Sequence, residues 1–354
     1  MIVAGGFLAG CSEDPATTGP TAPDAAPAEA LASLVGAPNS WEEVATMPTA
    51  RPSAAAGSAV NANGKSIVYV FGGRDVEDEE GSHIFATVHN YNISTNRWST
   101  KTGVSPFEAE AFNGARNIGG KLYLPGGQLY TGDGYFQLKI LQVYDPVAGT
   151  WTRKADMPAA SASGVSGVIG GKLYVLTGEE NIQENGQPCD ICGSVRTREL
   201  FRYNPAQDRW VRLKRSPNFH TGGVAGVIGG KFYVAGGLGT SQEHRNLDIY
   251  DPATNSWSSG APLPSDHSRG VGVVLGGRFY VVGGNTGEVV AYNPATNQWV
   301  QKAPFPVPTA WAMSGATAMV NGKERIVVQV GLGMGSRTTA ARRSCIRPRW
   351  SSRR

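Results

Sequence analysis

The chain has 354 residues, of which 47 are glycine and 22 proline, 40 % are hydrophobic and 17 % charged, with a net charge of +4. This much glycine and proline excludes a mostly helical protein, and this little charge excludes a coiled coil or an acidic disordered chain. Residues 337–354 contribute seven arginines and no acid, so the net charge of the rest of the chain, which we call the body, is −3. We expect a turn-rich all-β protein with no basic face on its body and no nucleic-acid partner.

The N-terminus has the features of an export and anchoring segment. Residues 1–10 are apolar but too short to span a bilayer, and they end in Leu8-Ala9-Gly10-Cys11. This stretch resembles the lipobox of bacterial lipoproteins, which implies a signal peptide over 1–10 that lacks its charged start, and acylation of Cys11. Residues 11–40 are rich in Pro, Ala, Thr and Asp and predict a flexible linker. We expect an exported protein, lipid-anchored at the outer membrane or cell surface or periplasmic, that touches a membrane only through this anchor.

Internal repeats organise residues 41–336. Tryptophans at 41, 98, 151, 210, 257 and 299 recur roughly every 50 residues. Five of them follow a tyrosine by seven residues, with a turn of Asp/Asn-Pro or Asn/Gly type between, which predicts a tight antiparallel hairpin. The other half of each repeat is a strand, a glycine turn and a second strand that often ends in Gly-Gly. The hairpins are Tyr91–Trp98, Tyr144–Trp151, Tyr203–Trp210, Tyr250–Trp257 and Tyr292–Trp299.

These repeats resemble the kelch repeat, because the double glycine, the tyrosine and the tryptophan recur together in register. The resemblance implies a β-propeller, here with six blades of four antiparallel strands. The Trp41 strand has no preceding tyrosine strand, so we expect it to close the sixth blade and leave no open edge.

The C-terminal tail departs from the repeat pattern. After Gly335 the sixth blade needs a third strand, but residues 337–354 are arginine-rich, lack apolar alternation and contain the unpaired Cys345. We therefore predict that the sixth blade is incomplete and that this tail is non-native in sequence, as a shifted reading frame would make it.

One face of the propeller is expected to carry the site. The connections on it vary in length, whereas the other face has only short turns, and variable loops on a rigid scaffold are where function usually lies. A proline follows each tryptophan strand, and the third residue after it is expected to start the next blade near the central channel. The residue type at this position differs from blade to blade. We predict that this set lines a pocket for a small polar or anionic ligand, with Trp311 as a stacking platform. The candidates from this position are Arg51, Ser161, His220, His267 and Trp311. Glu110 joins them because it stands at the equivalent distance before the Gly-Gly of the second blade, and Arg269 lies two residues after His267.

No cofactor or metal is expected. His220 and His267 could share a metal, but no nearby cysteine fits the tyrosine–cysteine cross-link of a galactose-oxidase-like copper site. Cys189 and Cys192 form half a zinc site at most, so a local disulfide is the favoured interpretation in an exported protein. The acidic run at 75–80 could bind calcium, although a solvated loop is the default interpretation.

Two function classes remain. The first is a binding or scaffold module for a carbohydrate or a protein ligand. The second is a sugar mutarotase resembling N-acetylneuraminate epimerase, in which Glu110 with His220 or His267 would move a proton and Arg51 or Arg269 would hold a carboxylate.

Overall fold

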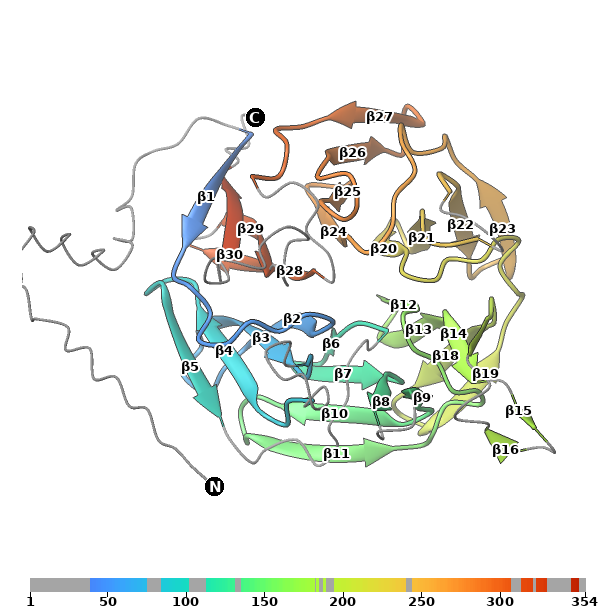
Figure 1. The fold of residues 1–354 in the computed structure, drawn as a ribbon, viewed down its shortest axis with the longest axis horizontal. Coiled ribbons are helices and arrows are strands. Elements are labelled where there is room, and N and C mark those ends of the chain that lie inside the picture. The colour runs from blue at the N-terminus through green and yellow to red at the C-terminus, as the bar shows by residue number, and fades with distance from the viewer. Residues whose placement is uncertain are drawn as a thin grey trace, which may run out of the picture.

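The structure is a computed structural model that describes residues 39–74, 84–101, 113–130, 135–181, 183–184, 187–188, 194–239, 244–306, 313–320, 323–329 and 345–349. This described part contains β-strands and no helix, and so no helix that could cross a membrane. Its four-stranded antiparallel sheets stand around a central axis like the blades of a propeller (Figure 1).

Five blades each take their four strands from one stretch of chain. The first blade is β2 (Ala55–Val60), β3 (Ser66–Phe71), β4 (Val88–Asn92) and β5 (Arg97–Lys101), and the second is β6 (Arg116–Ile118), β7 (Lys121–Pro125), β10 (Leu141–Asp145) and β11 (Thr150–Lys154). The third is β12 (Val165–Ile169), β13 (Lys172–Leu176), β18 (Leu200–Asn204) and β19 (Arg209–Arg212). The fourth is β20 (Val224–Ile228), β21 (Lys231–Ala235), β22 (Leu247–Asp251) and β23 (Ser256–Ser259), and the fifth is β24 (Val271–Leu275), β25 (Arg278–Val282), β26 (Val289–Asn293) and β27 (Gln298–Gln301).

Small hairpins are inserted between the second and third strands of two blades. They are β8 (Gln128–Tyr130) with β9 (Tyr135–Gln137) in the second blade, and β14 (Glu179–Asn181) with β17 (Ser194–Arg196) in the third, where β15 (Gln183–Glu184) also pairs with β16 (Gln187–Pro188).

A further four-stranded sheet, the closing sheet, joins the two ends of the chain. Its order is β1 (Ser40–Val44), β30 (Cys345–Arg349), β29 (Lys323–Gln329) and β28 (Ser314–Val320). The predicted all-β antiparallel propeller is thus confirmed. Instead of six blades, the structure has five blades that are each continuous in sequence, and one sheet made from both ends of the chain.

The prediction that the third strand of this sheet is missing is wrong. Strand β30, from the arginine-rich tail, pairs with β1 over five residue pairs and with β29 over two. Strand pairing uses backbone groups, so a segment without apolar alternation can still form it. Pro348 nevertheless supplies no N–H to the ladder from its position opposite Trp41. Whether residues 337–354 are native in sequence stays a prediction.

The tyrosine and tryptophan of the first, third, fourth and fifth blades hold neighbouring sheets together through a contact that we call the clamp. In the fourth blade Asn255 Oδ1 accepts hydrogen bonds from Tyr250 Oη at 2.7 Å and from the backbone N–H of Lys214 at 3.0 Å, and Trp257 Nε1 donates to Lys214 O at 2.9 Å. Asn255 has a φ of 48°, which asparagine tolerates better than most residues. The same clamp is built by Asn96 and Trp98 on Ala45, by Asp208 and Trp210 on Ala155, and by Asn297 and Trp299 on Ala261.

The closing sheet uses the same contact. Trp41 Nε1 donates to Ala303 O at 3.0 Å, and Ala303 N donates to Asn39 Oδ1 at 3.1 Å. Strand β1 thereby binds the segment that follows the last strand of the fifth blade, as the tryptophan strands of the first, third, fourth and fifth blades bind the segment that follows the preceding sheet. The second blade is the exception, because Gly149 stands in the asparagine position.

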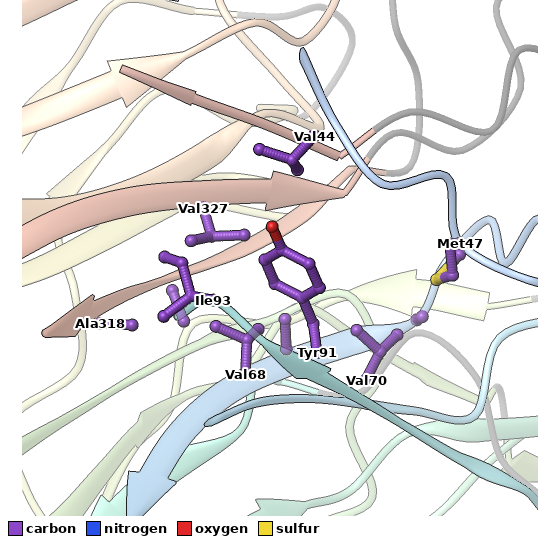
Figure 2. Packing of buried hydrophobic residues seen from close by; sticks show 11 residues of the cluster. Val44, Met47, Val68, Val70, Tyr91, Ile93, Ala318 and Val327 are labelled. Carbon is purple, nitrogen blue, oxygen red and sulfur yellow. The ribbon is translucent and has the colours of Figure 1, made fainter. Parts of the chain in front are cut away.

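The hydrophobic core is divided into clusters between adjacent sheets. Between the first blade and the closing sheet, Tyr91 lies among Val44, Met47, Val70 and Val327 (Figure 2). Five comparable clusters occupy the other junctions. Each sheet therefore depends on both neighbours for burial of its apolar faces.

Candidate functional site

A cavity of about 670 Å³ lies where the inner strands of the sheets meet. Its described lining comes from the first residues of inner strands, from the connections that lead into them and from the starts of the connections after β3, β7, β13 and β21. No residue of the short glycine turns on the other face contributes to this described lining. The cavity is of the size that holds a small molecule or the end of a chain.

The wall of the cavity is built mainly from small residues, and Arg116 is the exception. Ala55, Val165, Val224 and Val271 line it from four other inner strands. Arg116 lies on β6 at the position that is Gly57, Gly167 and Gly226 in the first, third and fourth blades and Val273 in the fifth, as the pairing with the central tyrosine of each second strand shows. Among the inner-strand residues of the described lining, Arg116 thus has the one charged side chain.

Among the described residues, Arg116 is held by main-chain oxygens only. Its Nε donates to Ser166 O at 2.8 Å on the inner strand of the next blade, and Nη1 donates to Ala115 O at 3.3 Å. Burial lowers the pKa of Arg116 to about 10, so the group remains charged at neutral pH. None of the ion pairs among the described residues includes it. A half-buried cation without a carboxylate partner favours an anion beside it.

Asn113, which is fully buried, fixes the wall next to Arg116. Its Nδ2 donates to Pro125 O and Ser161 O, and its Oδ1 accepts from Gly164 N at 2.7 Å and Ser161 Oγ at 3.1 Å. All four hydrogen-bonding positions of the amide are used. The second and third blades are therefore joined rigidly where Arg116 crosses between them.

Arg269 lies on the rim of the cavity in an unusual backbone conformation. Its φ is 59°, and the equivalent residues Ser53, Ser163 and Gly222 also have positive φ. Gly222 N donates to Ser163 O and Arg269 N to Gly222 O, both at 2.6 Å, so these residues form a backbone chain around the mouth. An arginine costs more than glycine in the left-handed region, and such conformations cluster at functional sites.

The inserted hairpins raise and connect the rim on four blades. Arg74 Nη1 donates to Tyr135 Oη at 2.5 Å, and Asn181 accepts from Gln137 N at 2.7 Å while donating to Tyr135 O at 3.0 Å. Arg196 donates to Gly239 O in the fourth blade. Among these residues Arg74 lines the cavity, together with Glu179 from β14.

Four of the predicted site residues are buried beside the cavity, outside its described lining. Arg51, Ser161, His220 and His267 have exposed fractions of 0–3 %. Arg51 donates to Gly72 O, and His220 makes the equivalent contact to Gly236 O at 2.7 Å. Both side chains thus tie the start of a blade to its double glycine, each through its own carbonyl partner.

His220 also contacts a buried carboxylate. Its Nε2 lies 3.0 Å from Asp248 Oδ2, which also accepts from Ser216 and Asn218. Those hydrogen bonds outweigh burial and hold the pKa of Asp248 below its usual value. Burial lowers the pKa of His267 to about 4, so its ring is neutral at physiological pH.

Of the remaining predicted residues, one lines the cavity and the others lie outside the described part of the chain. Arg269 lines it. Glu110, Trp311, Cys11, Cys189, Cys192 and the acidic run at 75–80 lie outside the described residues. Sequence reasoning missed Arg74 and Arg116, although Arg116 could have been found by aligning the inner strands and noting an arginine where neighbours have glycine.

The described lining carries Arg74, Arg116 and Arg269 against the single acid Glu179. Three guanidinium groups in a cleft attract and orient carboxylate, sulfate or phosphate groups. No histidine is part of this described lining. The arrangement thus supports binding of an anionic group, and His220 and His267 of the predicted acid–base pair lie outside this described lining.

Comparisons with known proteins agree with the fold. Residues 221–264 match the family model of the kelch motif. The chain is 31 % identical over 148 residues to "Kelch-like protein terF" of Aspergillus terreus, covering 40 % of this chain and 31 % of that protein. It is 30 % identical over 155 residues to "Kelch repeat and BTB domain-containing protein 8" of Homo sapiens, covering 43 % and 22 %. The chain thus spans less than a third of these curated relatives.

A solved structure described as "Structure of YjhT" has a similar fold. The TM-score is 0.64 at 14 % sequence identity, over 85 % of this chain and 95 % of that one. At this identity the likeness concerns the fold alone. Taken together, the repeats and the sheet arrangement make this chain a kelch-type β-propeller.

Proposed function

We propose that this kelch-repeat propeller is a binding module that takes an anionic group of its ligand into the axial cavity. The observation that carries the proposal is Arg116, a half-buried guanidinium held by two carbonyl oxygens, without a carboxylate partner among the described residues. Arg74 and Arg269 on the rim add positive charge, and Glu179 can accept hydrogen bonds from hydroxyl groups. A carbohydrate that bears a carboxylate, or an acidic peptide end, has this combination of groups.

Ring closure is part of the proposal. We infer that the closing sheet acts as a sixth blade, because Trp41 and Asn39 make the clamp contact to Ala303 and because β28 lines the cavity with Ser314 and Gly315. A closed ring keeps the inner strands, and therefore the three arginines, at fixed separations. Such preorganisation lowers the entropic cost of binding.

Calorimetric titration with a matched panel tests the ligand class. The panel contains galacturonate and N-acetylneuraminate, the neutral sugars galactose and N-acetylmannosamine, and a short acidic peptide beside its amide-blocked form. We expect measurable binding of charged members and none of their neutral counterparts. Equal affinity for galactose and galacturonate would refute an anion site.

The mutarotase alternative is tested with the same samples. It requires an acid–base pair in contact with the sugar, and His220 and His267 lie outside the described cavity lining. NMR of freshly dissolved N-acetylneuraminate with the protein measures the rate of anomer exchange. We expect the uncatalysed rate, and a rate that rises in proportion to protein concentration would replace the binding proposal by catalysis.

We also propose that the protein is exported and held at a bacterial envelope through Cys11. The support is the sequence Leu8-Ala9-Gly10-Cys11 followed by a linker rich in proline and alanine. Metabolic labelling with a palmitate analogue, on a gene with a full signal sequence, should label the wild type and leave Cys11→Ser unlabelled. An unlabelled wild type would end this proposal and leave the cavity proposal untouched.

A further inference from the structure

The outer edge of the third blade carries a run of cations. From Arg209 to Arg215 the sequence reads RWVRLKR, with four cations and no acid. Arg209, Arg212, Lys214 and Arg215 are all exposed. The prediction that the body has no basic face is therefore wrong. The net charge of −3 did not reveal this strand, because acidic residues elsewhere in the body offset its four cations.

The fold does not require this charge. Two of the equivalent outer strands read SWSS in β23 and QWVQ in β27, and both blades form the same clamp. The outer strands β5 (RWSTK) and β11 (TWTRK) carry two cations each, fewer than the four between Arg209 and Arg215. Exposed edges can be protected by charged side chains, yet the edges at β23 and β27 use neutral polar residues instead. Strand β19 thus has a charge that its structural role leaves unexplained.

One acid organises part of the run. Glu199, with an exposed fraction of 6 %, contacts Arg215 and lies 3.6 Å from Arg212. The two arginine side chains are nevertheless 63 % and 65 % exposed, so donors of both guanidinium groups still face solvent. Arg209 and Lys214 take part in no ion pair among the described residues.

The aromatic ring within the run is turned inward. Trp210 Nε1 donates to Ala155 O at 2.8 Å, and its ring lies 5.0 Å from that of Tyr203. Single-stranded nucleic acids are bound by cations combined with exposed aromatic rings on which bases stack. No such ring is presented between Arg209 and Arg215, and the cations follow one strand and its extension rather than a broad surface of the kind that meets a membrane.

We propose that residues 209–215 form a docking edge for a linear anionic polysaccharide with carboxylate or sulfate groups. The four strand residues of β19 cover about 13 Å and the three residues after it continue the run, which is long enough for several sugar units with repeated charges. Arginine is suited to these planar groups because its guanidinium donates two parallel hydrogen bonds. This edge lies on the outside of the third blade (Figure 1) and is separate from the axial cavity.

The test compares two variants with the same change in charge. Arg209→Gln/Lys214→Gln removes two cations from the edge, and Lys65→Gln/Lys323→Gln removes two exposed lysines from the first blade and the closing sheet. Both variants retain the arginine-rich tail, so its contribution cancels. The side chains of Arg209 and Lys214 are exposed, and matching circular dichroism and thermal midpoints verify that folding is retained.

Fluorescence anisotropy measures binding of labelled heparin hexasaccharide, polygalacturonate hexamer and a single-stranded DNA dodecamer at 50 mM and 200 mM salt. We expect salt-sensitive binding of at least one polysaccharide that weakens about tenfold in the edge variant and stays unchanged in the control. Heparin alone, or polygalacturonate as well, would identify the anionic group. Equal loss in both variants, DNA binding as tight as that of the polysaccharides, or no binding would each overturn the proposal.

Discussion

The clamp predicts that one asparagine at the blade surface has an effect on stability usually seen for core residues. Replacement of Asn255 by alanine removes the acceptor of Tyr250 Oη and of Lys214 N–H together. The Tyr250 hydroxyl belongs to a fully buried residue, so the loss of its acceptor costs about 1–3 kcal/mol. The N–H of Lys214 lies at the surface and adds about 0.5–1 kcal/mol.

The backbone adds a third contribution. Asn255 has a φ of 48°, and alanine in the left-handed region costs about 1 kcal/mol. The three contributions give a loss of about 2.5–5 kcal/mol for Asn255→Ala. Asn255→Gly should lose about 1 kcal/mol less, because glycine adopts this conformation without strain. Asn255→Asp should be nearly neutral, because Asp208 makes the same contacts to Tyr203 and Ala155 in the third blade.

Urea unfolding at pH 7, followed by tryptophan fluorescence and circular dichroism, measures these differences. The order of stability should be wild type and Asp, then Gly, then Ala. An alanine variant within about 0.5 kcal/mol of wild type, or an aspartate variant as unstable as alanine, would show that the clamp is not what joins the blades.

Two further predictions concern glycine and acid. Gly126→Ala should be strongly destabilising in thermal unfolding, because its new Cβ would collide with Ser161 O. Gly119→Ala has a similar φ of 61° but open space around it, so it should cost only about 1 kcal/mol. Equal effects of the two substitutions would contradict the packing around Asn113. Burial lowers the pKa of His267 to about 4, so the unfolded chain binds more protons and stability should fall as pH decreases from about 6.5 to 4, by about 3 kcal/mol. His267→Asn should flatten that part of the pH–stability curve, and an unchanged slope would argue against a neutral buried imidazole.

The repeat could be predicted from sequence because each blade needs the same physical parts. Tyr250 and Trp257 face each other across a hairpin, the turn asparagine needs a positive φ, and the double glycine passes close to neighbouring backbone. These requirements fix residue types at fixed spacing. β30 could not be predicted, because its pairing rests on backbone groups that no side-chain pattern reports.

The site was harder to predict, because the residue type at equivalent positions differs between blades for two reasons. His220 differs from Arg51 since each is fitted to its own carbonyl and side-chain partners inside a blade. Arg116, at the position of Gly167 in the third blade, lines the cavity and contacts only carbonyl oxygens among the described residues. Only the structure shows which residue turns toward the blade interior and which lines the cavity.

The central claim, that Arg116 receives an anion in the axial cavity, is tested most directly by one pair of variants. Arg116→Gln and Arg278→Gln remove the same charge, the first in the cavity wall and the second from β25, outside the described lining. Titration with the tightest charged ligand of the panel should show affinity about tenfold or more weaker for Arg116→Gln, since a hydrogen bond to a charged group contributes about 1.5–3 kcal/mol. Arg278→Gln should match the wild type. Equal affinities for the wild type and Arg116→Gln would contradict the account.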